Sequence, residues 1–217
     1  MQRIFRLSTL AQFILYTFFA PGLQAQQLPV TVKIGQQEWM ARNLDVSTFR
    51  NGDTIPEAQT DAAWKTAYME EKPAWCYYGN DPQNGLKYGK LYNWYAVNDA
   101  RGLAPKGYHV PGKAAWDSLM LFLGGQKIAG KKLKNNGGWP KAGNGTNESG
   151  FSALPGSIRY YSGYFDPDRS NGHWWTNTEL PPMYVWQYYL MSADDGVGYY
   201  SRDYGKGAGM SVRCVRD

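Results

Sequence analysis

A helical repeat of apolar residues stands out in the middle of the chain. The side chains that recur at the spacing of one helix face are Trp116, Leu119, Met120 and Leu123. Pro111 holds the residue before it in an extended conformation, and Gly124 and Gly125 end the pattern. The sequence therefore predicts one amphipathic helix after Pro111, with Trp116 and Leu119 in the core.

Period-two alternation of apolar and polar residues marks strands at both ends of the chain. Residues 30–34 alternate around valine and isoleucine, and residues 37–41 begin a second strand. Toward the C-terminus the same pattern covers residues 184–191, 197–201 and 209–215. These last segments predict an antiparallel meander.

Local turn and capping residues complete the expected fold. The run Asp194 to Gly196 is a hairpin signal. Thr60 or Asp61 can cap a short helix that reaches Trp64. Helices flanked by aromatic-rich strands predict an α+β domain.

The first residues have the pattern of a secretory signal peptide. Two arginines precede an apolar run at 13–20, and residues 23–25 form an acceptable cleavage site. The alternative, a membrane anchor, needs about 20 apolar residues, and this run is shorter. We expect a signal peptide at 1–25 and a single domain at 26–217, secreted or at the cell surface, with no membrane insertion after cleavage. No cysteine follows the apolar run to accept a lipid.

Composition narrows the classes of partner. The formal net charge is +5, and removing Arg3 and Arg6 with the signal leaves 21 − 18 = +3. Acids are interspersed among the bases, which gives no electrostatic case for binding nucleic acid. Aromatic residues make up 16% of the chain, which also contains 25 glycines. Secreted glycan-binding and adhesive domains share this profile, as do other β-rich folds, and nothing in the sequence indicates an oligomeric state.

The two cysteines raise the question of a disulfide. Cys76 and Cys214 both lie in strand-like segments. An even number of cysteines in an exported chain favours a bridge between them. The alternative is a pair of buried free thiols.

Several motifs resemble one known family. The sequence LAPKGYHVPGKAAWDSL at 103–119 is similar to the P-x-G-W-H-V-P signature of the Fibrobacter succinogenes major paralogous domain. The segments that match other family motifs are IGQQEWMARNLDV, YGKLYNWYA, FSALPGSIR and SVRCVRD. Gly112 and Ala115 depart from the family's capping residue and acid, so the reciprocal helix cap is absent at a cost of about 1 kcal/mol.

More distantly, the chain is similar to formylglycine-generating-enzyme-like domains, which carry a C-type-lectin-like fold. The resemblance implies that fold here, with two main helices, short antiparallel strands, long loops and adjacent N- and C-terminal strands. It assigns residues 88–97 to the first main helix and places the strand of Val30 beside the final strand.

The most site-like stretch is 173–179. Alternation places Trp175, Asn177 and Glu179 on one face of a strand, where a ring, an amide and a carboxylate could contact a sugar. Calcium-dependent lectins of the implied fold have a Trp-Asn-Asp run in a comparable strand. The alternative is a core strand with hydrogen-bonded polar neighbours.

The loop at 166–172 is expected to assist that face. Asp166 and Asp168 give it the look of a calcium loop, but the glycine falls one place late and Asn177 stands where the final acid belongs. We therefore expect no metal site and no cofactor, with calcium as the one ion to test.

Catalysis finds little support in the sequence. Only His109 and His173 are present, and no nucleophile elbow occurs. We expect an exported, non-catalytic binding or adhesion domain that recognises a glycan or a cell-surface partner. The alternative is a secreted enzyme of the formylglycine-generating-like oxidase type or a glycoside hydrolase with its carboxylates scattered in sequence.

Overall fold

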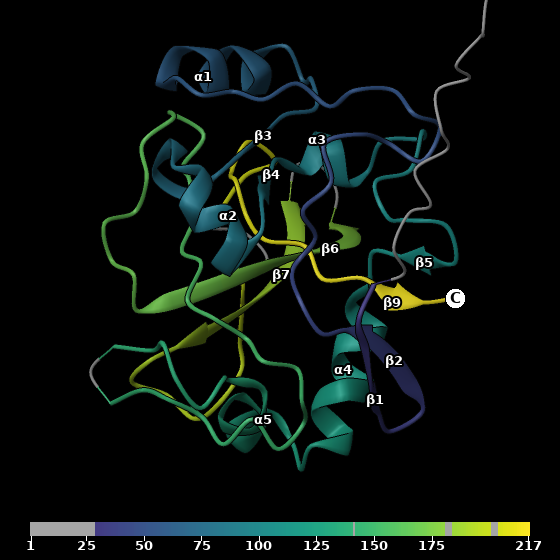
Figure 1. The fold of residues 1–217 in the computed structure, drawn as a ribbon, viewed down its shortest axis with the longest axis vertical. Coiled ribbons are helices and arrows are strands. Elements are labelled where there is room, and N and C mark those ends of the chain that lie inside the picture. The colour runs from purple at the N-terminus through teal and green to yellow at the C-terminus, as the bar shows by residue number, and fades with distance from the viewer. Residues whose placement is uncertain (1–28, 141, 181–183, 201–203) are drawn as a thin grey trace, which may run out of the picture.

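The computed structural model describes residues 29–140, 142–180, 184–200 and 204–217 (Figure 1). The expected signal peptide at 1–25 lies outside the described residues. The helices are α1 (Asp61–Met69), α2 (Pro82–Tyr88), α3 (Trp94–Val97), α4 (Lys113–Phe122) and α5 (Gln126–Leu133), with a short 3-10 turn at Tyr78–Asn80.

The strands pair antiparallel throughout, in three small sheets. One sheet has the order β1-β2-β9-β5, a second pairs β3 with β4, and the third has the order β6-β7-β8. The strands are β1 (Thr31–Ile34), β2 (Gln37–Met40), β3 (Trp75–Cys76), β4 (Leu91–Tyr92), β5 (Tyr108–His109), β6 (Asn171–Leu180), β7 (Tyr184–Met191), β8 (Gly198–Tyr200) and β9 (Val215–Arg216). The predicted α+β class is confirmed. Of the predicted C-terminal meander, β7 pairs with β8 as expected, but the last strand, β9, lies in the first sheet between β2 and β5. None of the described helices has the length and apolar character to cross a membrane.

The first and last described strands lie in one sheet, but not by the predicted pairing. The strand beside β9 is β2, through Trp39 opposite Val215, and β1 lies beyond it at the edge. A tight turn at Gly35, whose φ is 61°, folds β1 back against β2. The second strand of this hairpin, β2, therefore pairs with the C-terminal strand β9, and the first strand does not.

Strands β6 and β7 separate two apolar cores. Trp174 lies with Trp116 and Tyr188 in one cluster, whereas Trp175 lies with Val185 in the other. Figure 1 shows β6 and β7 crossing the middle of the molecule, with α1, α2 and α3 on one side and α4 and α5 on the other. Because neighbouring side chains of a strand point to opposite faces, both tryptophans of this strand are buried.

Helix α4 is the predicted core helix. Trp116 is buried, and its ring stacks on Tyr188 with centroids 4.9 Å apart. The helix has no cap from its own Gly112, but the Thr178 hydroxyl accepts a hydrogen bond from the Lys113 amide at 2.9 Å. A side chain in place of the hydrogen of Gly112 would lie 3.1 Å from that hydroxyl. The missing cap is thus supplied by β6, and the glycine makes room for it.

The segment 88–97 is not the helix that the resemblance implied. Helix α2 ends at Tyr88, and Gly89, with a φ of 72°, turns the chain into β4. A new turn of helix, α3, then starts where the Asn93 side chain accepts a hydrogen bond from the Ala96 amide at 3.0 Å. The prediction for α1 is confirmed, since Thr60 caps it.

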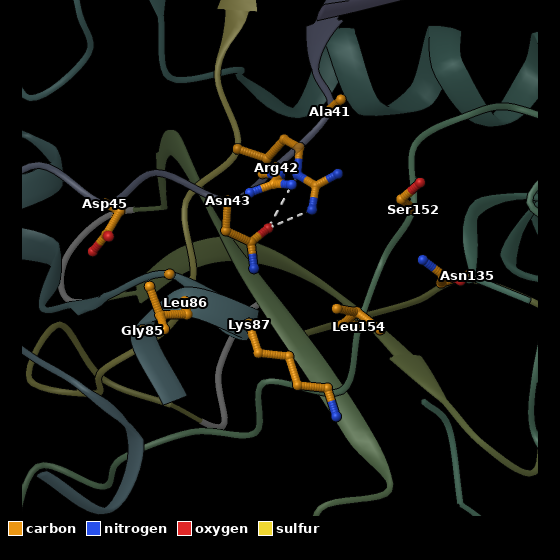
Figure 2. A pocket seen from close by; sticks show the side chains of 12 residues that line it. Ala41, Arg42, Asn43, Asp45, Gly85, Leu86, Lys87, Asn135, Ser152 and Leu154 are labelled. Carbon is orange, nitrogen blue, oxygen red and sulfur yellow. Dashed lines mark hydrogen bonds between the residues drawn. The ribbon is translucent and has the colours of Figure 1, made fainter. Parts of the chain in front are cut away.

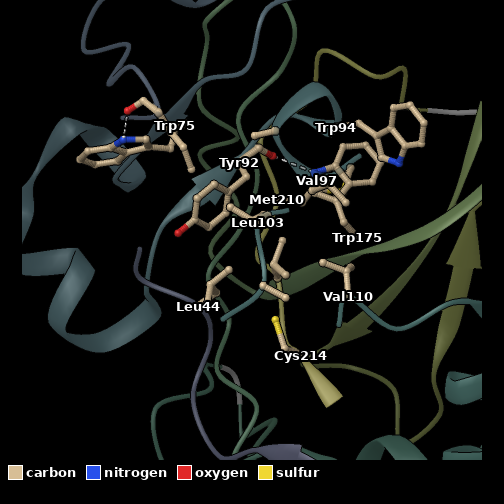
Figure 3. Packing of buried hydrophobic residues seen from close by; sticks show 14 of the residues in the cluster. Leu44, Trp75, Tyr92, Trp94, Val97, Leu103, Val110, Trp175, Met210 and Cys214 are labelled. Carbon is tan, nitrogen blue, oxygen red and sulfur yellow. Dashed lines mark hydrogen bonds between the residues drawn. The ribbon is translucent and has the colours of Figure 1, made fainter. Parts of the chain in front are cut away.

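The predicted disulfide is not formed. Cys76 and Cys214 are both free thiols, and each is buried in a different apolar cluster. Cys76 packs beside Trp64, under α1, whereas Figure 3 shows Cys214 near Leu44 and Val110 in the larger core. Burial raises the pKa of each thiol to about 12, so neither is a reactive thiolate at neutral pH.

Candidate binding cleft

The predicted stacking ring is not available to a ligand. Trp175 is fully buried, and its indole nitrogen donates a hydrogen bond to the Tyr92 carbonyl at 2.8 Å (Figure 3). A sugar can stack only on a ring face that it can reach. The prediction that Trp175 stacks on a sugar is therefore wrong, and the core-strand alternative describes this residue.

The other predicted site residues lie apart from one another. Asn177 and Glu179 are exposed near the far end of β6, where Glu179 forms an ion pair with Lys206. Asp166 and Asp168 precede the first residue of the strand, and β6 has ten residues. At roughly 3.3 Å per residue the strand spans about 30 Å. The structure does not bring the two pairs together.

The carboxylates of Asp166 and Asp168 accept hydrogen bonds from backbone amides of their own loop. The Asp166 carboxylate accepts a hydrogen bond from the Asp168 amide at 2.9 Å, and Asp168 accepts one from the Ser170 amide at 3.0 Å. These are local turn bonds of the kind that aspartate makes. In the part of the chain that the structure describes, no three His, Cys, Asp or Glu side chains gather as a metal site.

A cleft of about 570 Å³ opens elsewhere, where five chain segments meet (Figure 2). These segments are the stretch after β2, the helix α2, the second residue after α5, the extended run at 152–154 and the second residue before β9. The lining residues are Ala41, Arg42, Asn43, Asp45, Gly85, Leu86, Lys87, Gly89, Asn135, Ser152, Leu154 and Arg213. The volume falls within the range of small-ligand sites, roughly 300–1,000 Å³.

The floor of the cleft is organised around Asn43. Its side-chain oxygen accepts hydrogen bonds from the Trp174 indole at 2.9 Å and from two nitrogens of Arg213 at 2.7 and 3.0 Å. Its side-chain nitrogen donates to the Tyr88 carbonyl at 2.8 Å and to the Ser211 hydroxyl at 3.2 Å. One amide thus joins β6, the end of α2 and the segment before β9, which fixes the floor.

Arg213 is a buried cation with neutral partners. Only 2% of the residue is exposed, and its guanidinium donates to Asn43 and to the Phe151 carbonyl. The guanidinium lies over the Phe151 ring, 4.2 Å from the centroid. Burial lowers the pKa of Arg213 to about 9, which is still above neutral, so the group remains charged at pH 7.

The rim adds two further cations and an amide. Arg42 and Lys87 are exposed and form no ion pair within the described ranges. Asn135 uses its side-chain oxygen to accept from the Gly137 amide at 3.1 Å, and Figure 2 shows its side-chain nitrogen facing the cleft. Among the described lining residues the one carboxylate, that of Asp45, forms an ion pair with Lys90 at 2.6 Å.

A family model matches almost the whole described chain. Residues 32–216 match the model of the Fibrobacter succinogenes major domain. The chain belongs to that family. No curated protein and no solved structure matches the chain.

In this Fibrobacter succinogenes major domain, the cleft residues that the sequence analysis missed lie inside the motifs that carry the resemblance. Asn43 lies in IGQQEWMARNLDV, and Arg213 lies in SVRCVRD. The sequence signal that could have identified Asn43 and Arg213 was a polar residue between apolar positions of a family motif. Their contact could not be read from the sequence, because the two residues are 170 positions apart.

The histidines of this family member do not form a catalytic pair. His173 is buried between aromatic rings, and its Nδ1 atom has no hydrogen-bond partner. Burial lowers its pKa to about 3. His109 is exposed near the C-terminus, where its Nδ1 lies 2.8 Å from the Asp217 carboxylate. Neither histidine lines the cleft.

Proposed function

We propose that this protein is an exported, non-catalytic binding domain that recognises a glycan or a cell-surface partner through the cleft around Asn43. The observation that carries the proposal is the set of free donors on a fixed floor. Arg42, Lys87 and the Asn135 amide face the opening, while the floor is held by hydrogen bonds from three segments. Donors that are held in place lose little entropy on binding, which favours recognition of a polar ligand.

The enzyme alternatives have less support. An oxidase of the formylglycine-generating type needs reactive thiols, and Cys76 and Cys214 are buried with raised pKa values. A glycoside hydrolase needs two carboxylates that flank the substrate. Asp45 is the only carboxylate among the described residues of the cleft, and Lys90 neutralises it.

The C-type-lectin-like fold belongs to the same proposal. It is supported by the mixed α+β composition, by the place of the first and last described strands in one sheet and by the short strands joined by long loops. Export is supported by the basic start, the apolar run at 13–20 and the cleavage site at 23–25. A binding domain of this kind acts outside the cell or at its surface.

A glycan array with residues 26–217 tests the proposal, both with and without calcium. Leu86 on α2 and Leu121 on α4 are each 79% exposed, and only Leu86 lines the cleft. Leu86→Ala should weaken binding to the glycans that give signal, whereas Leu121→Ala should leave it unchanged. Because both side chains are exposed, neither change should alter the melting temperature.

A second pair of variants locates the site if the cleft is not used. Tyr161 and Tyr164 are more than half exposed, whereas Trp175 is fully buried. Binding that is lost in Tyr161→Ala or Tyr164→Ala but kept in Leu86→Ala would move recognition to that aromatic surface. An array with no glycan signal, together with hydrolysis of a glycoside, would replace the binding proposal by the hydrolase alternative.

A further inference from the structure

We infer that the cleft around Asn43 binds the anionic group of an acidic saccharide, a carboxylate or a sulfate ester. This inference rests on the proposed binding function and names the chemical class of its ligand. It is carried by the charges at the cleft, by the buried guanidinium of Arg213 and by the pairing of Asp45, the carboxylate among the described lining residues, with Lys90.

The cleft has an excess of positive charge, and no acid among the described residues pairs with Arg42, Lys87 or Arg213. Arg42, Lys87 and Arg213 line it, and Asp45 is the only acid among its described lining residues. Lys90 is almost fully buried, and its ammonium group lies 2.6 Å from the Asp45 carboxylate and 3.0 Å from the Tyr77 hydroxyl. Asp45 is therefore satisfied by Lys90, and the three cations of the lining keep their charge.

Arg213 is buried although no carboxylate among the described residues is paired with it, which is unusual for a charged side chain. A buried guanidinium is normally paired with a carboxylate or phosphate, because its desolvation costs several kcal/mol. Here its acceptors are two neutral oxygens, from Asn43 and Phe151. A guanidinium has more N–H donors than these two acceptors use. An anion in the cleft would supply both the missing charge and a further acceptor.

The two exposed cations lie where they could hold the same anion. Figure 2 shows Arg42 and Lys87 on opposite sides of Asn43, with the opening between them. Some bases elsewhere are paired with acids, as Lys113 is with Asp117 and Arg216 is with Glu38. Arg42 and Lys87 have no such acid in the part of the chain that the structure describes. Leu86 and Leu154 supply apolar surface beside them, which suits the carbon face of a sugar ring.

Calorimetric titration of residues 26–217 with three saccharides tests the inference. The probes are a galacturonate trisaccharide, a sulfated chondroitin disaccharide and a neutral galactose trisaccharide. We expect at least one acidic probe to bind ten times or more tightly than the neutral one, with an affinity that falls as salt rises. The galacturonate and chondroitin arms distinguish a carboxylate from a sulfate ester as the preferred anion.

Two double variants separate the cleft from the overall charge of the protein. Arg42→Gln with Lys87→Gln removes two charges at the cleft, and Lys65→Gln with Lys106→Gln removes two exposed charges outside it. We expect the first pair to weaken binding of the acidic probe tenfold or more and the second to change it less than twofold. Arg213 stays in place in both, because it is part of the buried floor.

Each result bears on the inference. Equal losses in the two double variants would show attraction to the overall charge only and would overturn it. Tight binding of the neutral trisaccharide, unchanged by Arg42→Gln with Lys87→Gln but weakened by Leu86→Ala, would overturn it and leave the proposed function standing. Failure of all three saccharides, together with an empty glycan array, would overturn both.

Discussion

Between pH 7.5 and pH 5.0, acid should destabilise the protein through His173. This histidine is 4% exposed on β6 and lies between the rings of Tyr189 and Tyr204, each with its centroid 5.6 Å away. Burial lowers its pKa from 6.5 to about 3. In the unfolded chain the imidazole takes up a proton below pH 6.5, whereas in the folded protein it stays neutral. Stability from this residue is therefore present above pH 6.5 and is lost as the pH falls from there toward 3.

The size of the effect follows from that shift. Each pH unit between the two pKa values is worth about 1.4 kcal/mol, so the fall from pH 7.5 to pH 5.0 should cost about 2 kcal/mol of unfolding free energy. For a domain of this size that loss corresponds to a drop of roughly 4–8 °C in melting temperature. Asp53 and Asp99, whose pKa values are lowered by hydrogen bonds from Asn51 and Arg101, titrate below this window. The interval from pH 7.5 to 5.0 therefore isolates the histidine.

Urea unfolding at both pH values, on wild type and two variants, measures this loss. His173→Gln should lower stability at pH 7.5 but remove most of the further loss at pH 5.0. His109→Gln, at the other and exposed histidine, should retain the full pH dependence. If His173→Gln loses as much stability between the two pH values as wild type does, the buried neutral imidazole is not the cause and the reasoning is wrong.

The remaining predictions concern packing, capping and the thiols. Trp116→Ala should cost roughly 3–5 kcal/mol of unfolding free energy, because the ring fills a core between α4 and β7; a melting temperature close to wild type would place the ring at the surface. Thr178→Val should cost about 1 kcal/mol by removing the acceptor of the Lys113 amide, whereas Thr178→Ser should keep most of the stability; equal melting temperatures for both variants would refute the capping role. Thiol labelling should find two reactive groups in denaturant without reductant and almost none in the native protein, since Cys76 and Cys214 are free and buried; fewer than two in denaturant would indicate a bridge.

The parts of the fold that could be predicted are those determined by residues close together in the sequence. The α4 helix shows as a 3.6-residue repeat, and Thr60 marks the start of α1 by its capping oxygen. The prediction of one helix at 88–97 was wrong because local sequence does not decide the structure there. The aromatic residues of this segment fit a strand and a helix equally, and the outcome depends on Gly89 and Asn93, which break the segment in two places.

The candidate site could not be predicted, because contacts across the whole chain build it. Asn43 reaches Trp174 and Arg213, which are 131 and 170 residues away. The prediction at 173–179 used the right alternation but assumed one core beside the strand. A second core on the other face buries Trp175 as well as Trp174. Periodicity says which residues share a face, and it does not say whether that face meets solvent.

The same contacts tie the cleft to the stability of the molecule. Asn43 bonds Trp174, a core residue of the α4 side, and Arg213, whose guanidinium covers the Phe151 ring of the same core. Truncation of Asn43 leaves the buried Trp174 indole without its acceptor and leaves Arg213 with the Phe151 carbonyl, so its effect on binding could not be separated from a loss of folding. Arg42 and Lys87 carry positive charge at the same opening without taking part in those bonds. For this reason the ligand preference of the cleft has to be tested with variants of Arg42 and Lys87, because a change in affinity can then be measured on a protein that still folds.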